Sequence, residues 1–331
     1  SNPIKVNSGT FTIHNGVLKT STIAGLFNNN SYTLSLVVND IYNTMNISSA
    51  VFNFKNFDIS VINTIKNQIK LPKEIAAQID SISNIKGSID IKGNIKNGQI
   101  WANTNLKNTS FVYKPFGAVV RILNGDLYVR DNTIYLDKIN SRISSMPVFL
   151  DGRISNIYKT PNLNIFVSAK PTQSFLDRFY NTKAVYPVKI KGDVNFNTRL
   201  HGPVNMISSH SNLNIGENSS IYYLGATIAG APTGAIAPDG GLATNPVSVI
   251  SDIILYPQRM KINSLKYNQT ILSQNKRKSV QNQLNASGEI SILKNNVIGF
   301  KNFRVKTNQS TDAKIFNVLL KKPTIKQGVF T

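Results

Sequence analysis

Apolar and polar residues alternate with a period of two along most of the chain. The clearest example is residues 188–200, in which Val, Ile and Phe alternate with Lys, Asp and Asn. Successive side chains of a strand point to opposite faces, so this segment predicts one strand of about 40 Å with an apolar and a polar face. The same alternation recurs over residues 88–96, 127–136 and 162–169. The sequence therefore predicts a mainly β protein: a long curled antiparallel sheet, forming a folded-over groove or half-barrel, with a few short α-helices.

Pairs of residues that tolerate positive φ separate the predicted strands. These pairs are Asn15-Gly16, Asn97-Gly98, Asn124-Gly125 and Asp131-Asn132. Two-residue hairpins require positive φ, so we expect a tight turn at each pair. The strands should consequently follow one another as a meander.

The period changes to three and four residues between residues 58 and 82, which is typical of helices. Two short helices are predicted there, with Pro72 in the first turn of the second. Another short helix is predicted over residues 172–180. Residues 225–247 are rich in Gly, Ala and Pro, which favours a flexible loop. The predicted organisation is N-terminal strands plus the two helices (1–83), a central β-meander (84–224), the loop (225–247) and C-terminal strands (248–331).

The chain is strongly basic. Its 331 residues include 37 Lys and Arg against 16 Asp and Glu, a formal net charge of +21. Such a charge attracts the phosphate of lipids or nucleic acids, but codon drift in an AT-rich genome also produces it. Nucleic-acid binding needs basic residues interleaved with aromatics on one face, and Tyr113, Tyr128 and Tyr135 offer only a weak version of that pattern. No nucleic-acid partner is therefore expected.

The sequence carries no constellation typical of an enzyme. It has no cysteine, which excludes disulfides and thiol catalysis. His14, His201 and His210 lack metal-ligand partners at close spacing, and no P-loop, nucleophile elbow or dinucleotide fingerprint occurs. We therefore predict no catalytic residue, metal or cofactor. A polysaccharide-acting enzyme with clustered carboxylates in a cleft stays open as a third alternative.

A sheet with one apolar face must cover that face. A second sheet would give a closed core, whereas curling of the same sheet would give a groove for acyl chains, each buried CH₂ gaining about 0.8 kcal/mol. A groove predicts that Val194→Asp leaves a folded protein that loses lipid, and a closed core predicts unfolding. The residues predicted to line the groove are Leu127, Val129, Ile134, Leu136, Leu163, Ile165, Val167, Val188, Ile190, Val194 and Phe196.

Three segments carry a family resemblance. They are a helix with a Gly-led strand over residues 71–108, the unit LNGDLYVRDNTIYLDKIN with its continuation over 123–169, and TQSFLDRFY followed by YPVKIKGDVNFNTRLHGP over 172–203. A weaker echo follows at 284–307. This pattern of apolar, Gly and turn positions resembles the AsmA-like superfamily (AsmA/TamB/YhdP-type bacterial envelope proteins).

The resemblance implies a folded-over β-sheet with a hydrophobic interior, a periplasmic location and an inner-membrane anchor. No window of about 20 apolar residues occurs, so we expect that anchor upstream of Ser1. The leading hypothesis is the periplasmic part of an envelope protein that shields phospholipid acyl chains for inter-membrane transport or outer-membrane biogenesis. The alternative is a non-enzymatic envelope or surface interaction or scaffold module with a closed β core.

Overall fold

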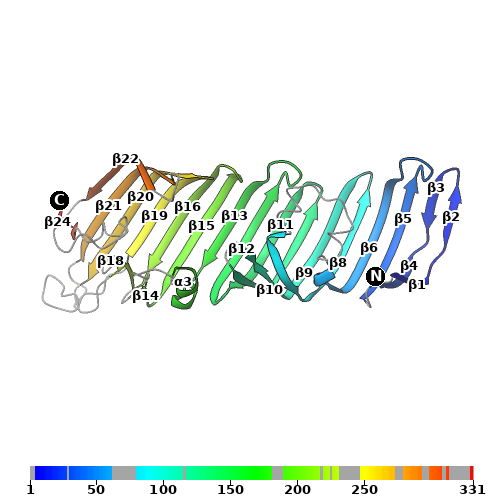
Figure 1. Cartoon of the computed structure of the whole chain (residues 1–331), viewed down its shortest axis with the longest axis horizontal. Helices are drawn as coiled ribbons and strands as arrows, with labels where there is room; N and C mark the ends of the chain where they lie inside the picture. Colours follow the sequence, from blue (N-terminus) through cyan, green and yellow to red (C-terminus); the bar gives the residue numbers. More distant parts are fainter. Residues whose placement is uncertain are drawn as a thin grey trace. The chain divides into compact units, whose positions relative to one another are not determined.

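The chain is mostly β, with one large antiparallel sheet that is not closed and very few helical residues (Figure 1). This confirms the predicted class. The chain falls into an N-terminal unit, Ser1–Ser144 with Phe149–Pro161, and a C-terminal unit, Ser145–Val148 with Asn162–Thr331. The computed structural model describes residues 4–27, 30–61, 80–114, 117–180, 189–216, 219–223, 226–230, 247–272, 279–292, 298–307, 311–312 and 329–330.

The N-terminal unit is an antiparallel meander. Its strands are β1 (Ile4–Ser8), β2 (Phe11–His14), β3 (Val17–Thr20), β4 (Ile23–Phe27), β5 (Asn30–Asn39), β6 (Asn46–Asp58), β7 (Ile82–Lys86), β8 (Ser88–Lys96), β9 (Gln99–Tyr113), β10 (Ala118–Arg130) and β11 (Thr133–Ile143), with a 3₁₀ turn η1 (Ile59–Val61) after β6. Strands β3 and β4 pair with β5, and β7 and β8 pair with β9. From β5 onward, neighbouring strands of the sheet pair in the order β5, β6, β8, β9, β10 and β11. Strand β12 (Met146–Ser155) contributes residues to both units.

The C-terminal unit has the same architecture. Its main strands pair in the order β13, β15, β16, β19, β20, β21 and β22, and β14, β17 and β18 form a small second sheet. Its elements are β13 (Asn162–Ala169), α3 (Gln173–Tyr180), β14 (Lys189–Lys191), β15 (Val194–Pro203), β16 (Ile207–Ile215), β17 (Ser220–Tyr223), β18 (Ala226–Gly230), β19 (Val247–Tyr256), β20 (Arg259–Leu272), β21 (Ser279–Ile292), β22 (Ile298–Thr307), β23 (Thr311–Asp312) and β24 (Val329–Phe330).

The alternation of the sequence produces two distinct faces. In β8 the Ile residues and Gly93 are half-buried, whereas Lys92 and the other polar residues are exposed. Strand pairing aligns these positions, so that side chains of one kind lie across the strands in rows. One such row on the side that we call the apolar face is Leu34, Phe52, Gly93, Ala102, Val129 and Ile134.

Two of the predicted hairpin turns have both residues at positive φ. Asn15-Gly16 joins β2 to β3 with φ of 48° and 73°, and Asn97-Gly98 joins β8 to β9 with φ of 50° and 77°. Asp131, at φ 50°, begins the turn between β10 and β11. The turn predicted at Asn124-Gly125 is wrong. This pair lies inside β10, where the register with β11 shifts on both sides of Asn124. At this irregularity Gly125 has φ 142°, a conformation that residues with a side chain rarely adopt.

The single long strand predicted over residues 188–200 is also wrong. The chain breaks between β14 and β15, because Gly192 takes φ 76° and the Asp193 N–H donates to Ser219 Oγ at 2.8 Å. Strand β14 then pairs with β17, whereas β15 pairs with β13 and β16. In the sequence Gly192 counts as an apolar position and so continues the alternation. In the structure it takes the positive φ that ends the strand.

Helix α3 confirms the helix predicted over residues 172–180. Thr172 caps it, since its Oγ1 accepts the N–H of Phe175 at 3.2 Å. The two helices predicted between residues 58 and 82 lie mostly outside the described residues. In the described part, Asp58 Oδ1 accepts the Ser60 N–H at 2.8 Å at the start of η1, and β7 begins at Ile82.

The predicted loop over residues 225–247 is described only at its ends. Residues 226–230 form β18, and Val247 begins β19. The remainder, residues 231–246, lies outside the described part of the chain.

A closed cluster lies in the C-terminal unit. Val194, Ile215 and Val247 are 3%, 1% and 2% exposed, and they come from three neighbouring strands in direct register. Half-buried side chains pack around them, among them Ile190 and Tyr267. This cluster has the burial expected of an ordinary hydrophobic core.

Candidate functional site

An apolar pocket of about 300 Å³ opens on the apolar face of the N-terminal unit. Strand pairing brings its walls together, since β4 and β6 both pair with β5. Tyr32 and Phe57 are buried, while Leu34 and Phe54 are only half-buried. The six side chains that line it are Ile4, Phe27, Tyr32, Leu34, Phe54 and Phe57.

Aromatic rings form the wall of this pocket. The Phe27 and Phe57 rings are stacked with centroids 6.1 Å apart, and Phe54 meets Phe57 edge to face at 5.5 Å. Tyr32 and Phe54 lie with their centroids 6.0 Å apart. Offset and edge-on ring pairs of this kind stabilise one another beyond the area that they bury. The wall is therefore held in place by contacts among its own residues.

Glycine allows the pocket wall to form. A Cβ on Gly25 would lie 2.8 Å from the Tyr32 hydroxyl and 2.9 Å from a ring carbon, so the Tyr32 ring covers the bare backbone. In the same way the Phe52 ring covers Gly93 on the apolar face, where a Cβ would lie 2.7 Å or less from it. An aromatic side chain placed across from a strand glycine is a known means of filling the missing volume.

Four predicted lining residues extend this apolar face over β10 and β11. Leu127 is paired with Leu136, and Val129 with Ile134. All four side chains are half-buried. The structure therefore brings these residues together, on the same face as the pocket of the same unit.

The other predicted lining residues belong to the C-terminal unit, apart from Val188, which lies outside the described residues. Val194 belongs to the closed cluster, and Ile190 packs against it. Ile165 is buried as well. Leu163, Val167 and Phe196 are half-buried.

Polar groups interrupt the corresponding face of the C-terminal unit. The hydroxyls of Thr198, Ser209 and Ser211 are buried and lie 2.8–3.0 Å from one another, so that they satisfy one another's hydrogen bonds. Burial also raises the pKa of Tyr267 to about 12, because the phenolate form loses its hydration. This face therefore combines a closed aliphatic cluster with buried hydroxyls.

The residues that line the pocket were missed as a site by sequence reasoning. Two of them, Phe54 and Phe57, come from VFNFKNF, whose apolar residues alternate in part and which was predicted only as part of the N-terminal strands. The signal that could have found the site is this concentration of Phe on one face, next to the Tyr of β5. It would have required the pairing of β5 with β6 to be known.

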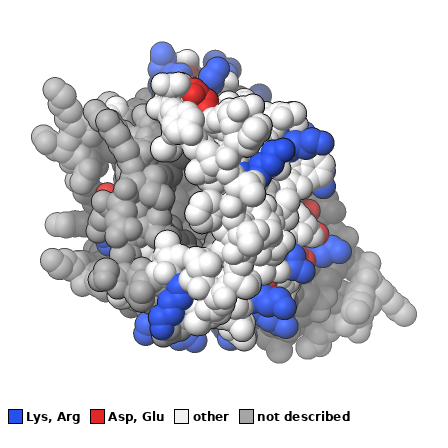
Figure 2. All heavy atoms as spheres, turned by 90° about the vertical axis from the view of Figure 1, so that its right-hand side faces the viewer, with Lys and Arg blue, Asp and Glu red and all other residues white. Residues whose placement is uncertain are grey.

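Charged side chains are scattered over the described part of the face that Figure 2 shows. Figure 2 shows Lys and Arg side chains scattered around a largely uncharged surface, with few Asp and Glu. Within the described residues, no three His, Asp or Glu side chains are arranged to hold a metal ion. In that same part of the chain, no helix has the length and apolar character needed to cross a membrane.

Comparison of the chain with known protein families, characterised proteins and solved structures found no match.

Proposed function

We propose that this protein shields phospholipid acyl chains on the apolar face of its N-terminal unit. It would do so as the non-enzymatic, periplasmic part of an AsmA-like envelope protein that is anchored to the inner membrane and serves lipid transport or outer-membrane biogenesis. The observation that carries the proposal is the pocket lined by Leu34, Phe54 and four other apolar or aromatic side chains on a sheet that is not closed. The family, the location and the anchor rest on the sequence resemblance.

The physical argument is that of hydrophobic transfer. A pocket of about 300 Å³ is at the small end of ligand pockets, so it accommodates the end of a chain rather than a whole lipid. The half-buried row that continues to Val129 and Ile134 covers further methylenes, each worth about 0.8 kcal/mol when buried. The headgroup stays in water, where scattered Lys and Arg side chains attract its phosphate.

The second candidate is an envelope interaction or scaffold module with a closed core. The cluster of Val194, Ile215 and Val247 favours it, because side chains that are at most 3% exposed leave no room for a ligand. The two candidates differ in one observable property, namely bound lipid.

The test is native mass spectrometry of the full 331-residue chain, followed by organic extraction and lipid identification. Ile4 lines the pocket yet is 65% exposed, so Ile4→Glu places a charge at the pocket with little loss of packing. Val51 is 56% exposed and lies on the opposite face of the sheet, so Val51→Glu is the matched control.

We expect phospholipid on the wild-type chain and on Val51→Glu, and a several-fold loss from Ile4→Glu at unchanged thermal stability. A wild-type chain that carries no lipid, even after incubation with phosphatidylethanolamine vesicles, would reject the proposal in favour of the scaffold. Equal amounts of bound phospholipid on Ile4→Glu and Val51→Glu would show that the lipid does not bind at this pocket.

A further inference from the structure

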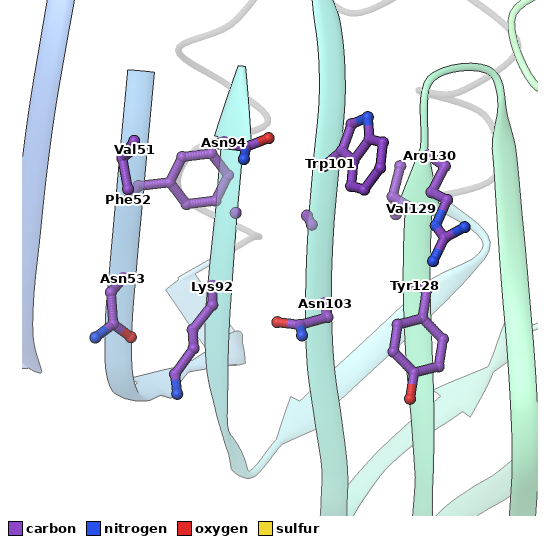
Figure 3. Close-up of a pocket in the computed structure, with 12 residues that line it drawn as sticks. Val51, Phe52, Asn53, Lys92, Asn94, Trp101, Asn103, Tyr128, Val129 and Arg130 are labelled. Atoms are coloured by element: carbon purple, nitrogen blue, oxygen red, sulfur yellow. The ribbon is translucent and has the colours of Figure 1, made fainter. Parts of the chain in front are cut away.

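A second pocket, of about 560 Å³, lies in the N-terminal unit and crosses β6, β8, β9 and β10. Its side chains form two parallel rows, each made of directly paired residues of the four strands (Figure 3). Three strand spacings give it a length of about 14 Å. One row is Val51, Asn94, Trp101 and Arg130, and the other is Asn53, Lys92, Asn103 and Tyr128.

This trough opens on the polar face of the sheet. Between its two rows lie Phe52, Gly93, Ala102 and Val129, whose side chains belong to the apolar face. Ile91 and Ile95, which flank Gly93 on the apolar face of β8, do not line this pocket. The bottom of the trough is therefore formed by backbone atoms of the four strands, and its walls are formed by the side chains of the two rows.

The trough holds two cations without a paired carboxylate. Arg130 places its guanidinium carbon 5.2 Å from the centre of the Trp101 ring and 5.9 Å from that of Tyr135. Neither Arg130 nor Lys92 forms an ion pair with any residue that the structure describes. The aromatic rings fix the guanidinium in place while leaving its charge uncompensated.

The neighbouring carboxylates are already occupied. Asp131 Oδ1 accepts the Ile100 N–H at 3.1 Å, and Asp90 Oδ1 accepts the Asn56 N–H at 2.8 Å. Asp126 Oδ1 accepts the side-chain amide of Asn105 at 2.7 Å. These carboxylates hold the hairpins and bulges of the sheet together, and none of them forms an ion pair with Lys92 or Arg130 in the described structure.

The remaining groups suit a hydroxyl-rich ligand with flat faces. Trp101 is 50% exposed, although a large aromatic side chain gains from burial. Asn53 Oδ1 is buried without a hydrogen-bond partner in the described structure, which is costly unless a ligand or water supplies a donor. Asn94 and Asn103, from β8 and β9, also line the trough (Figure 3).

We propose that the trough binds a short anionic saccharide, with a sugar ring against the Trp101 indole and separate anionic groups (carboxylate, sulfate or phosphate) at Lys92 and at Arg130. The amides of the three Asn residues bind its hydroxyls. A lipid on the apolar face cannot supply this ligand, because the two pockets open on opposite faces of the sheet. A nucleic-acid strand fits less well, since only one of the rings, Trp101, is largely exposed and stacking along a strand uses several.

In the experiment the full chain is titrated with defined tetrasaccharides. Isothermal titration calorimetry and tryptophan fluorescence measure the binding. Trp101 is the only Trp of the chain, so a change in its emission reports contact at this site. The probes are α-1,4-galacturonate, chondroitin sulfate and heparin tetrasaccharides, with neutral maltotetraose and the oligonucleotide dT8 as comparisons.

We expect at least one anionic tetrasaccharide to bind at least tenfold more tightly than maltotetraose and to change the fluorescence of Trp101. Trp101→Ala should weaken binding at least tenfold. The double variant Lys92→Gln/Arg130→Gln should abolish the preference for the anionic probe over maltotetraose. The controls are Tyr42→Ala, a 75% exposed ring outside the trough, and Lys96→Gln, an exposed lysine of the same strand and face as Lys92. Neither should change affinity by more than twofold.

Three results would overturn the proposal. They are the absence of any anionic tetrasaccharide that binds above maltotetraose, binding of dT8 tighter than that of every saccharide, and binding that Lys96→Gln weakens as much as Lys92→Gln. None of these results depends on whether the apolar face carries lipid, so the two proposals fail independently.

Discussion

Two regions of the molecule, the pocket and β10 of the N-terminal unit and the β15–β16–β19 cluster of the C-terminal unit, bury the same kind of alternating strand to different degrees. In the N-terminal unit, Leu127, Val129 and the pocket residue Leu34 are only half-buried. In the C-terminal unit, Val194 and Ile215 are 3% and 1% exposed. The comparison teaches that alternation of apolar and polar residues determines which face of a strand is apolar, but not what covers that face.

The largest difference between the units should appear when a charge enters each apolar face. Val194→Asp would bury a carboxylate among Ile215 and Val247, so we expect a loss of about 4–5 kcal/mol in unfolding free energy, or failure to fold. Leu127→Asp can rotate its carboxylate toward water and should cost about 1–2 kcal/mol. Urea unfolding of the two variants measures both values. Similar losses would contradict the distinction between a closed and an open face.

A pH titration should affect the C-terminal unit through Tyr267. Its pKa is raised to about 12 from 10.0, so between these pH values the folded protein holds a proton that the unfolded chain has released. Stability should therefore fall as pH rises from 10 to 12, by roughly 2–3 kcal/mol for a shift of about two units.

Urea unfolding at pH 9 and pH 11.5 measures this loss. Tyr267→Phe removes the titrating group and is the control, because the ring keeps its contacts with the cluster. A wild-type loss no larger than that of Tyr267→Phe would show that the phenol is solvated.

A smaller effect should test the packing of the N-terminal apolar face. A Cβ on Gly93 would lie 2.4 Å from Phe52 Cζ and 2.5 Å from the Trp101 carbonyl oxygen, so Gly93→Ala must displace the ring or the strand. We expect a destabilisation of about 1–3 kcal/mol.

The matched control is Gly216→Ala, whose Cβ would meet nothing closer than 3.6 Å. It should change the unfolding free energy by less than about 0.5 kcal/mol. Equal thermal shifts for the two variants would mean that Phe52 is free to leave the apolar face.

Much of the fold could be predicted because local rules agree with one another. In β8 the alternation indicates the two faces, and Asn97-Gly98 ends the strand with the φ values that a two-residue turn needs. Helix α3 was predictable for the same reason, since the helical period and the Thr172 cap coincide.

The breaks could not be predicted, because glycine serves several conformations. Gly93 continues its strand, Gly125 forms a bulge and Gly192 ends β14. What distinguishes them is the partner across the sheet: Phe52 over Gly93, Ile139 beside Gly125 and Ser219 beside Gly192. These contacts join residues far apart in the sequence.

The candidate sites were predictable only in part for a related reason. That Leu127, Val129, Ile134 and Leu136 share one face could be predicted because one hairpin contains all four residues. The apolar pocket combines β1, β4, β5 and β6, and the polar trough combines β6, β8, β9 and β10. Neither site exists until the order and register of the strands are known.

The open sheet also has a consequence for how the protein changes over evolutionary time. Each strand pairs with strands next to it in the sequence or separated from it by only a few short elements. Inserting a duplicated hairpin between two paired strands would therefore replace one strand pairing by three similar ones and leave distant residues unchanged. Repeat proteins, whose stability is a sum over neighbouring elements, tolerate insertions for the same reason. A closed barrel cannot gain a hairpin in this way, because its diameter and strand tilt depend on strand number. The number of strands in such a sheet is consequently free to vary, two at a time, under selection for the length of surface that it presents.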